Sequence, residues 1–196
     1  MNLVQIGANR GNDHVTKLIK ESKKAFDKIV LVEPIEFVLE ELKACYLDVQ
    51  NVIIEKCIIS TSKEKFQKIF YHRGSNYGTS TLNKTHLTDH GCPDDDIEFF
   101  EIENRTLTEL LAKHNIYHLD YLFIDAEGSD IDILMSLDLS LVTVENIHLE
   151  IVHSDGAFKR GPKFKMLCEY LKSKDYDFIV NDVDLTAKKP NWHTIL

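Results

Sequence analysis

The first apolar run of this sequence, "LVQI" at residues 3–6, leads directly into a turn that contains Gly7 and Gly11. Because glycine has no Cβ, a ligand can approach the backbone closely at such positions. The spacing is G-x-x-x-G, so the G-x-G-x-x-G pattern that holds the pyrophosphate of a dinucleotide is absent. The turn therefore favours a ligand without phosphates over a dinucleotide; the alternative is an ordinary strand-to-helix turn.

Carboxylates stand where two later apolar runs end. Glu33 closes "KIVLVE" about twenty residues beyond the turn, a position from which a carboxylate can accept hydrogen bonds from ribose hydroxyls. Asp125 closes "LDYLFID", and Glu127 follows it in "AEGSD". Buried carboxylates need a partner, so a cationic ligand, a metal or a hydrogen-bonding network is expected here. For Glu127 and Asp130 the alternative is stabilisation of a helix N-terminus.

Histidines offer a second kind of chemistry. His148 and Glu150 share one face of the apolar segment "HLEIVH", but no third ligand is evident, so no metal site is predicted. We expect His148 to be structural. His153 is the last residue of this segment and stands in "VHSDG", where the strand is expected to open into the site; the pKa of imidazole, near 6.5, suits proton transfer.

The elements that must position these residues alternate along the chain. Strands are predicted at residues 3–6, 28–33, 51–60, 65–72, 97–102, 119–125, 145–153 and 176–182. Helices are predicted after Asn12 or Asp13, after Pro34, after the capping box of Thr106 and Glu109, around 131–135 and around 164–171. The final residues, including Trp192 and His193, are candidates for a short antiparallel partner strand.

This alternation indicates an α/β protein with a mostly parallel sheet, a Rossmann-like three-layer sandwich formed by one domain over residues 1–196. Ligands of such sheets bind at the carboxyl ends of the strands. That rule adds Cys57 and Ile58, and the stretch 150–155, to the residues expected to face the site. The polar segment 73–96 has no sustained period and is predicted to be a long loop or lid.

Composition and charge exclude several classes of protein. The net charge is −9, and residues 93–156 carry 16 acidic and 2 basic side chains, which argues against nucleic-acid binding. The sequence contains neither an apolar run of membrane-spanning length nor a signal peptide, so no membrane association is expected. The four cysteines form no CxxC and are expected to be reduced thiols in a cytoplasmic protein.

In combination, these motifs resemble the FkbM-type methyltransferases that use S-adenosylmethionine. The resemblance covers residues 3–156 and rests on "VQIGANRGND", "LVEP", "NRTLTELL", "LDYLFIDAEGSDIDIL" and "NIHLEIVHSDG". It implies a seven-stranded methyltransferase sheet and methyl transfer to a hydroxyl of a sugar, glycan or small metabolite. Many family members carry lysine at the position of Phe123, so any role of that lysine is missing here.

The resemblance also implies roles for individual residues. Gly7, Ala8, Asn9 and Gly11 would line the methionine part of S-adenosylmethionine, Glu33 would hold its ribose, and Asp125 would stand near its methionine end. The predicted donor site is completed by Pro34, Cys57 and Ile58. The candidates for a base that takes the hydroxyl proton are Asp125, Glu127 and His153.

Two other functions remain open at this point. A nicotinamide-dependent oxidoreductase is disfavoured by the missing G-x-G-x-x-G. A non-catalytic module that binds the donor or a partner gains weight from the missing lysine and from the start of the sequence at the first strand, without a leading helix. Closure over a substrate is then expected from the 73–96 loop or from a second subunit of a homo-oligomer.

Overall fold

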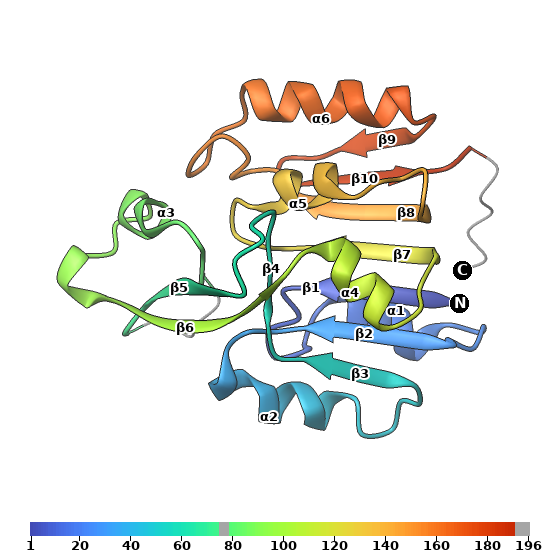
Figure 1. The fold of residues 1–196 in the computed structure, drawn as a ribbon, viewed down its shortest axis with the longest axis horizontal. Helices are drawn as coiled ribbons and strands as arrows, with labels where there is room; N and C mark the ends of the chain where they lie inside the picture. The colour runs from blue at the N-terminus through green and yellow to red at the C-terminus, as the bar shows by residue number, and fades with distance from the viewer. Residues whose placement is uncertain (75–78, 191–196) are drawn as a thin grey trace.

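The computed structural model describes residues 1–74 and 79–190, and in this part of the chain seven strands form one sheet (Figure 1). Its order is β3-β2-β1-β7-β8-β10-β9. The strands are β1 (Asn2–Ile6), β2 (Lys28–Val32), β3 (Val52–Glu55), β7 (His118–Ile124), β8 (Thr143–Glu150), β9 (Asp177–Val180) and β10 (Asp184–Lys188). Neighbours pair in parallel, except that β10 is antiparallel to β8 and β9. The predicted α/β class and mostly parallel seven-stranded sheet are confirmed.

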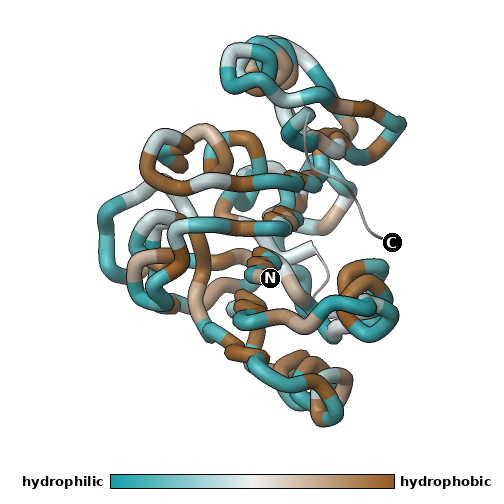
Figure 2. Tube along the Cα trace, turned by 90° about the vertical axis from the view of Figure 1, so that its right-hand side faces the viewer, coloured by the Kyte–Doolittle hydropathy of each residue, from teal (hydrophilic) through white to brown (hydrophobic). Residues whose placement is uncertain are grey.

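Helices cover both faces of this sheet (Figure 2). On one face lie α1 (His14–Glu21) and α2 (Glu36–Cys45), and on the other lie α4 (Leu107–Lys113), α5 (Asp130–Ser136) and α6 (Pro162–Ser173). Alternate residues of each strand serve the two faces: Leu3 packs with α1 and α2, whereas Val4 packs with α4 and α5. Of the described helices, none combines the length and the apolar character needed to cross a bilayer.

Local signals in the sequence explain where several helices begin. The Asp13 side chain accepts a hydrogen bond from the Thr16 N–H at 2.9 Å and caps α1. Thr106 and Glu109 form the predicted capping box of α4, and Pro162 occupies the first turn of α6. These starts fix the direction in which each helix leaves its strand.

A second group of elements stands beyond the carboxyl ends of the central strands, on the left of Figure 1. It contains β4 (Ile58–Ile59), β5 (Phe66–His72), α3 (Lys84–Asp89), a 3-10 turn (Asp94–Asp96) and β6 (Ile97–Arg105). β5 and β6 form an antiparallel ribbon, and β4 pairs in parallel with the end of β6. We call the described residues of 66–105 the β5–β6 arm.

The structure corrects three details of the predicted elements. The strand predicted at 51–60 breaks at Lys56 and Cys57, because β3 stays in the main sheet while β4 pairs with β6. The segment 73–96 is not wholly a loop: it contains α3, capped by Asn83, which is too short to show helical periodicity in sequence. The antiparallel partner of β8 is β10, at 184–188. The proposed partner around Trp192 lies outside the described residues.

Candidate active site

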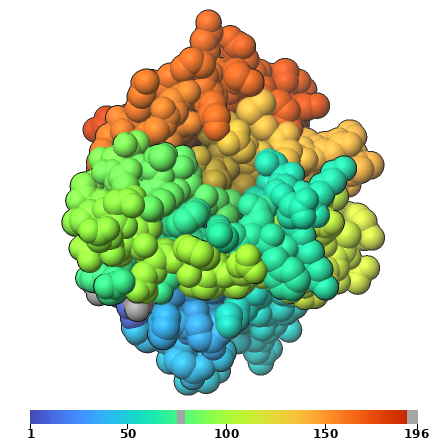
Figure 3. All heavy atoms as spheres, turned by 60° about the vertical axis from the view of Figure 1, so that its left-hand side comes forward, coloured from blue at the N-terminus to red at the C-terminus, as the bar shows by residue number. Residues whose placement is uncertain are grey.

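A cavity opens at the carboxyl ends of β1, β2 and β7, below the β5–β6 arm. Its empty volume is about 670 Å³, open solvent at the mouth included, which is in the range of small-molecule sites. Figure 3 shows green and teal atoms of the arm over this edge of the sheet, with a hollow between them and the orange C-terminal segments. The lining includes Glu127, a candidate base, and most of the predicted donor-site residues, namely Gly7, Asn9, Glu33, Pro34, Cys57, Ile58 and Asp125.

The two glycines of the first turn are required for different reasons. Gly7 lines the cavity at φ +79°, and a Cβ there would collide with the backbone carbonyl oxygen of Asp125, so the close approach of β1 and β7 requires glycine. Gly11, at φ +71°, is not among the cavity's lining residues; a Cβ there would lie 2.9 Å from Leu42 Cδ1 in α2. Ala8 is fully buried in the core. Gly11 and Ala8 thus shape the turn by packing, and their predicted contact with the donor stays a prediction.

Glu33 holds the turn and the start of the next segment together. Its two carboxylate oxygens accept hydrogen bonds from the N–H of Asn9, at 2.7 Å, and of Ile35, at 2.8 Å. Only 4% of Glu33 is exposed, and burial raises its pKa while the two N–H donors counteract that rise. The carboxylate is thus fixed at the cavity wall, with acceptor capacity left for hydroxyl donors.

Asn9 supplies a further acceptor. Its side-chain Oδ1 is buried and has no hydrogen-bond partner among the described residues, and Asn9 belongs to the cavity lining. Its φ of +45° is left-handed, a conformation that asparagine tolerates better than most residues. A buried acceptor without a partner is costly, so this position fits a ligand that brings a donor such as an ammonium group.

Carboxylates gather on the β7 and β8 side of the cavity. Burial, reinforced by Glu127 and by Asp184, raises the pKa of Asp125 to about 7. Burial, reinforced by Asp125 and Glu127, raises the pKa of Glu150 to about 8. One oxygen of Glu150, Oε2, is buried without a hydrogen-bond partner in the described part of the chain. The crowding of buried carboxyl groups disfavours their charged forms, and a cation bound here would relieve this effect.

Asp130 and Glu127 have separate roles. Asp130 is buried and accepts hydrogen bonds from the N–H of Ala126, at 2.9 Å, and Gly128, at 3.1 Å, which closes the turn before α5. This is the structural role weighed for it above. Glu127 has a left-handed backbone, with φ +48°, and its Oε2 lies 3.2 Å from His86 Nε2 in the arm.

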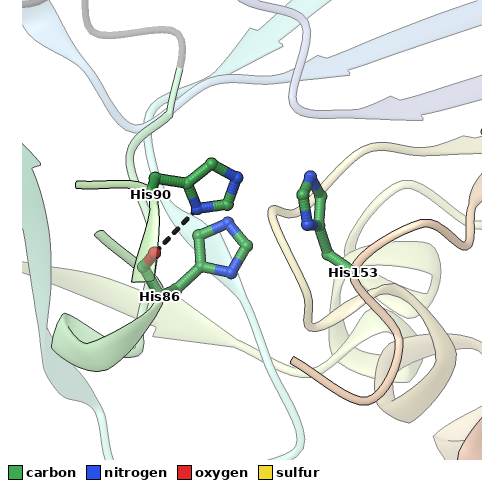
Figure 4. Close-up of side chains that lie close together, drawn as sticks. All are labelled: His86, His90 and His153. Atoms are coloured by element: carbon green, nitrogen blue, oxygen red, sulfur yellow. Dashed lines mark hydrogen bonds between the residues drawn. The ribbon is translucent and has the colours of Figure 1, made fainter. Parts of the chain in front are cut away.

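His153 meets two histidines of the arm (Figure 4). The ring centroids of His86, His90 and His153 lie 4.4 to 4.8 Å apart. His86 lies in α3, and His90 follows four residues later, just after the helix ends. Burial is the main cause that lowers the pKa of His153, and charge repulsion from His86 and His90 lowers it further. Sequence reasoning missed the pair, although the spacing H-x-x-x-H was visible. His148 lies apart and contacts the Thr186 hydroxyl at 2.8 Å.

The sequence matches a known family over most of its length. A family model for the methyltransferase FkbM domain matches residues 5–178. The chain belongs to the FkbM methyltransferase family. A crystal structure of methyltransferase FkbM from Methylobacillus flagellatus shares the fold at a TM-score of 0.56 and 17% identity. The match covers 95% of the present chain and 43% of that one, so this chain spans less than half the length of its FkbM neighbour.

Other solved structures are more distant from this FkbM chain. A precorrin-6y C5,15-methyltransferase from Geobacter metallireducens has a TM-score of 0.48 at 13% identity, over 96% of this chain and 80% of its own. An Aeropyrum pernix fibrillarin with natively bound S-adenosyl-L-methionine has a TM-score of 0.47 at 10% identity, over 95% and 65%. No curated protein matches the sequence significantly.

Proposed function

We propose that this FkbM-family chain transfers the methyl group of S-adenosylmethionine to a hydroxyl oxygen of a sugar, a glycan or a small metabolite. The observation that carries the proposal is the cavity itself. It combines the backbone-fixed carboxylate of Glu33, the partnerless acceptor of Asn9 and the acidic strand end at Asp125. This set suits a ligand with hydroxyls, an ammonium group and a sulfonium, and no phosphate.

Different residues of the cavity contact different parts of the donor. Glu33 accepts hydrogen bonds from the ribose hydroxyls, and Asn9 Oδ1 with Asp125 receives the ammonium group of the methionine end. Pro34, Cys57 and Ile58 offer the purine an apolar wall. Burial raises the pKa of the Cys57 thiol to about 11, so it stays protonated and serves as a small apolar group.

The acceptor side needs alignment and a place for a proton. When the acceptor oxygen bonds to the methyl carbon, the carbon–sulfur bond breaks, sulfur keeps the electron pair, and the hydroxyl proton must leave. Glu127 lies between the cavity and His86, and His153 lies beside that pair, so a carboxylate and imidazoles are available to take the proton. The arm above them covers part of the site and would help to hold the two reactants in line.

Donor binding is the first test. Isothermal titration should give one site for S-adenosylmethionine and for its demethylated product, and both should raise the melting temperature. NADH is the matched negative ligand, because a nicotinamide enzyme on this fold would bind it instead. Absence of heat and of a thermal shift with either sulfur ligand at millimolar concentration would overturn the proposal.

Turnover is the second test. A panel of sugar and small-molecule hydroxyl acceptors, followed through formation of the demethylated donor, should identify at least one substrate class. Methylation confined to nitrogen or carbon acceptors would contradict the assignment to oxygen. Donor binding without turnover on every acceptor would favour the non-catalytic module.

A further inference from the structure

Three histidines from two distant segments of the chain converge beside the donor cavity. His86 lies in α3, His90 directly follows that helix, and His153 comes from the turn after β8 (Figure 4). One ring nitrogen from each lies within 4.8 Å of those of the other two. One metal ion bound between the three imidazoles would account for this convergence of ring nitrogens.

We propose that His86, His90 and His153 bind one divalent transition-metal ion of the zinc type. Binding of the ion follows from the geometry of these side chains. Only its use in catalysis rests on the function proposed above.

The hydrogen bonds prepare His90 for coordination. Its Nδ1 lies 2.7 Å from the His86 carbonyl oxygen, which can only accept, so Nδ1 carries the proton and Nε2 keeps its lone pair. A backbone carbonyl that orients the imidazole in this way is the usual outer-shell partner of a metal-binding histidine.

His153 is held differently. Its Nδ1 accepts the N–H of Phe158 at 3.1 Å, so in the neutral ring Nε2 carries the proton. To coordinate an ion, His153 must bind it through Nδ1 in place of the Phe158 N–H, or move its proton from Nε2 to Nδ1, and either change ends this hydrogen bond. We therefore expect His153 to contribute least of the three to the affinity.

Two carboxylates adjoin the histidines and supply negative charge. Glu127, Glu150 and His153 form a second group whose ligand atoms lie within 4.8 Å of one another. Glu127 Oε2 lies 3.2 Å from His86 Nε2, so this carboxylate can accept a hydrogen bond from that ring and orient His86 as an outer-shell partner. Glu150 Oε2, buried and without a partner among the described residues, faces the same need for a cation.

The donor set selects the class of metal. Imidazole nitrogens favour Zn²⁺, Co²⁺, Ni²⁺ and Cu²⁺, whereas Mg²⁺ and Ca²⁺ prefer all-oxygen sites. Three protein ligands leave a coordination position open, as in catalytic zinc sites. Glu127 also lines the donor cavity, so that position is near the proposed methyl end. An acceptor hydroxyl that occupies it would have a lowered pKa and would lose its proton more readily to a neighbouring carboxylate.

Metal titration of the whole chain tests the site directly. After removal of bound metal with a chelator, Zn²⁺ should bind at one equivalent per chain in competition with a chromophoric chelator. Co²⁺ should give the intense visible absorption of a four-coordinate site with nitrogen ligands, and Zn²⁺ should abolish it. A wild-type chain that gives only the weak spectrum of hydrated Co²⁺ and no competition for Zn²⁺ overturns the proposal.

Substitutions locate the ion. His86→Ala and His90→Ala should each weaken Zn²⁺ binding by at least tenfold to a hundredfold, and His153→Ala by less. His118→Ala is the matched control, because His118 is about half exposed at the start of β7. This variant should bind Zn²⁺ with the affinity of the wild type. His86 is buried, so the half-buried His90 serves as the variant less prone to unfold. Wild-type affinity in both alanine variants would overturn the assignment.

Donor binding separates this proposal from the preceding one. His90→Ala should bind S-adenosylmethionine as the wild type does, since His90 is not a lining residue of the donor cavity. Zn²⁺ binding without donor binding would defeat the proposed function and leave the metal site standing. If donor binding and turnover both persist after complete removal of metal, the metal ion has no role in catalysis.

Discussion

The two sides of Glu127 are built by different means. We call the residues around the proposed donor cavity the donor side. Gly7, Glu33 and Asp125 on this side each follow a strand of the main sheet, and backbone hydrogen bonds between adjacent strands set their spacing. On the histidine side, His86 belongs to the β5–β6 arm and His153 to a turn after β8, and they meet through side chains. A parallel sheet fixes positions at its edge closely, whereas an arm is fixed only by the contacts through which it docks.

The arm docks through an apolar cluster that it shares with α2 and β4, and through hydrogen bonds to the turn after β7. Within the arm, Thr81 pairs with Phe70 through two backbone hydrogen bonds of 2.8 and 2.9 Å; its hydroxyl then donates to the Glu127 carbonyl oxygen at 3.0 Å. His86 then reaches the Glu127 carboxylate. We infer that the donor side is the more rigid half of the site and that the histidine side responds to changes in the arm. The variants below test this difference, from the largest expected effect to the smallest.

Gly7→Ala should be the most damaging change on the donor side. The new Cβ would collide with the Asp125 carbonyl oxygen at a positive φ, and we expect a loss of about 3 to 5 kcal/mol in the free energy of unfolding, measured in urea. Gly91→Ala is the matched control in the arm, since Gly91 has φ +83° and a Cβ there meets nothing within 4 Å. It should lose only about 1 kcal/mol. Equal losses would contradict the idea that contact with β7 sets the requirement at Gly7.

Glu127→Gln tests the residue that both sides share. The amide keeps the size of the side chain but loses its charge, so we expect turnover to fall about a hundredfold while donor affinity changes much less. Asp132→Asn, an exposed change in the first turn of α5, should leave both quantities close to wild type. Steady-state kinetics with direct measurement of donor binding separates the two effects. A large loss of donor affinity with unchanged turnover would place Glu127 wholly on the donor side.

Glu33→Gln should weaken the donor side without unfolding it. Its amide group faces one of the two backbone N–H donors and cannot accept from it, so we expect about a tenfold increase in the dissociation constant for S-adenosylmethionine by calorimetry. Metal affinity should not change, because Glu33 is outside both metal-ligand groups. Glu36→Gln, in the first turn of α2 with an exposed side chain, is the control. An unchanged dissociation constant would remove Glu33 from the proposed ribose contacts.

Thr81→Val should have the smallest effect and should act on the arm. Loss of the hydrogen bonds of its hydroxyl to the Glu127 carbonyl and from the Asn83 N–H should cost about 1 to 2 kcal/mol. Hydrogen exchange should become faster in α3 and stay unchanged in β1 and β2. Thr88→Val, which removes an exposed hydroxyl from the same helix, is the comparison. Faster exchange in β1 and β2 would show that the two sides are not independent.

Much of the donor side could be predicted from local sequence. An apolar run followed by glycine or a carboxylate marks the end of a buried strand, and the ends of parallel strands must meet at one edge of the sheet. The capping box at Thr106 and the cap at Asp13 are equally local and were found. The role of Gly11 was not predicted, because its contact with Leu42 depends on how α2 packs.

The histidine side could not be predicted in the same way. α3 has only six residues, too few for a periodic pattern, and it lies in a segment whose composition indicates a loop. His86 and His153 are 67 positions apart in the sequence, and in the structure neither directly follows the last residue of a strand. The break in the predicted strand at 51–60 has the same origin, since β4 leaves the sheet to pair with a segment more than forty residues later.

The sequence by itself therefore determined the sheet, the glycine turn and the carboxylates of the donor side, because hydrophobic periodicity and strand-end position are properties of neighbouring residues. Only the tertiary structure decided which carboxylates crowd together and which histidines meet. Those contacts depend on the docking of the β5–β6 arm against the turn after β7, a long-range packing that local patterns do not encode.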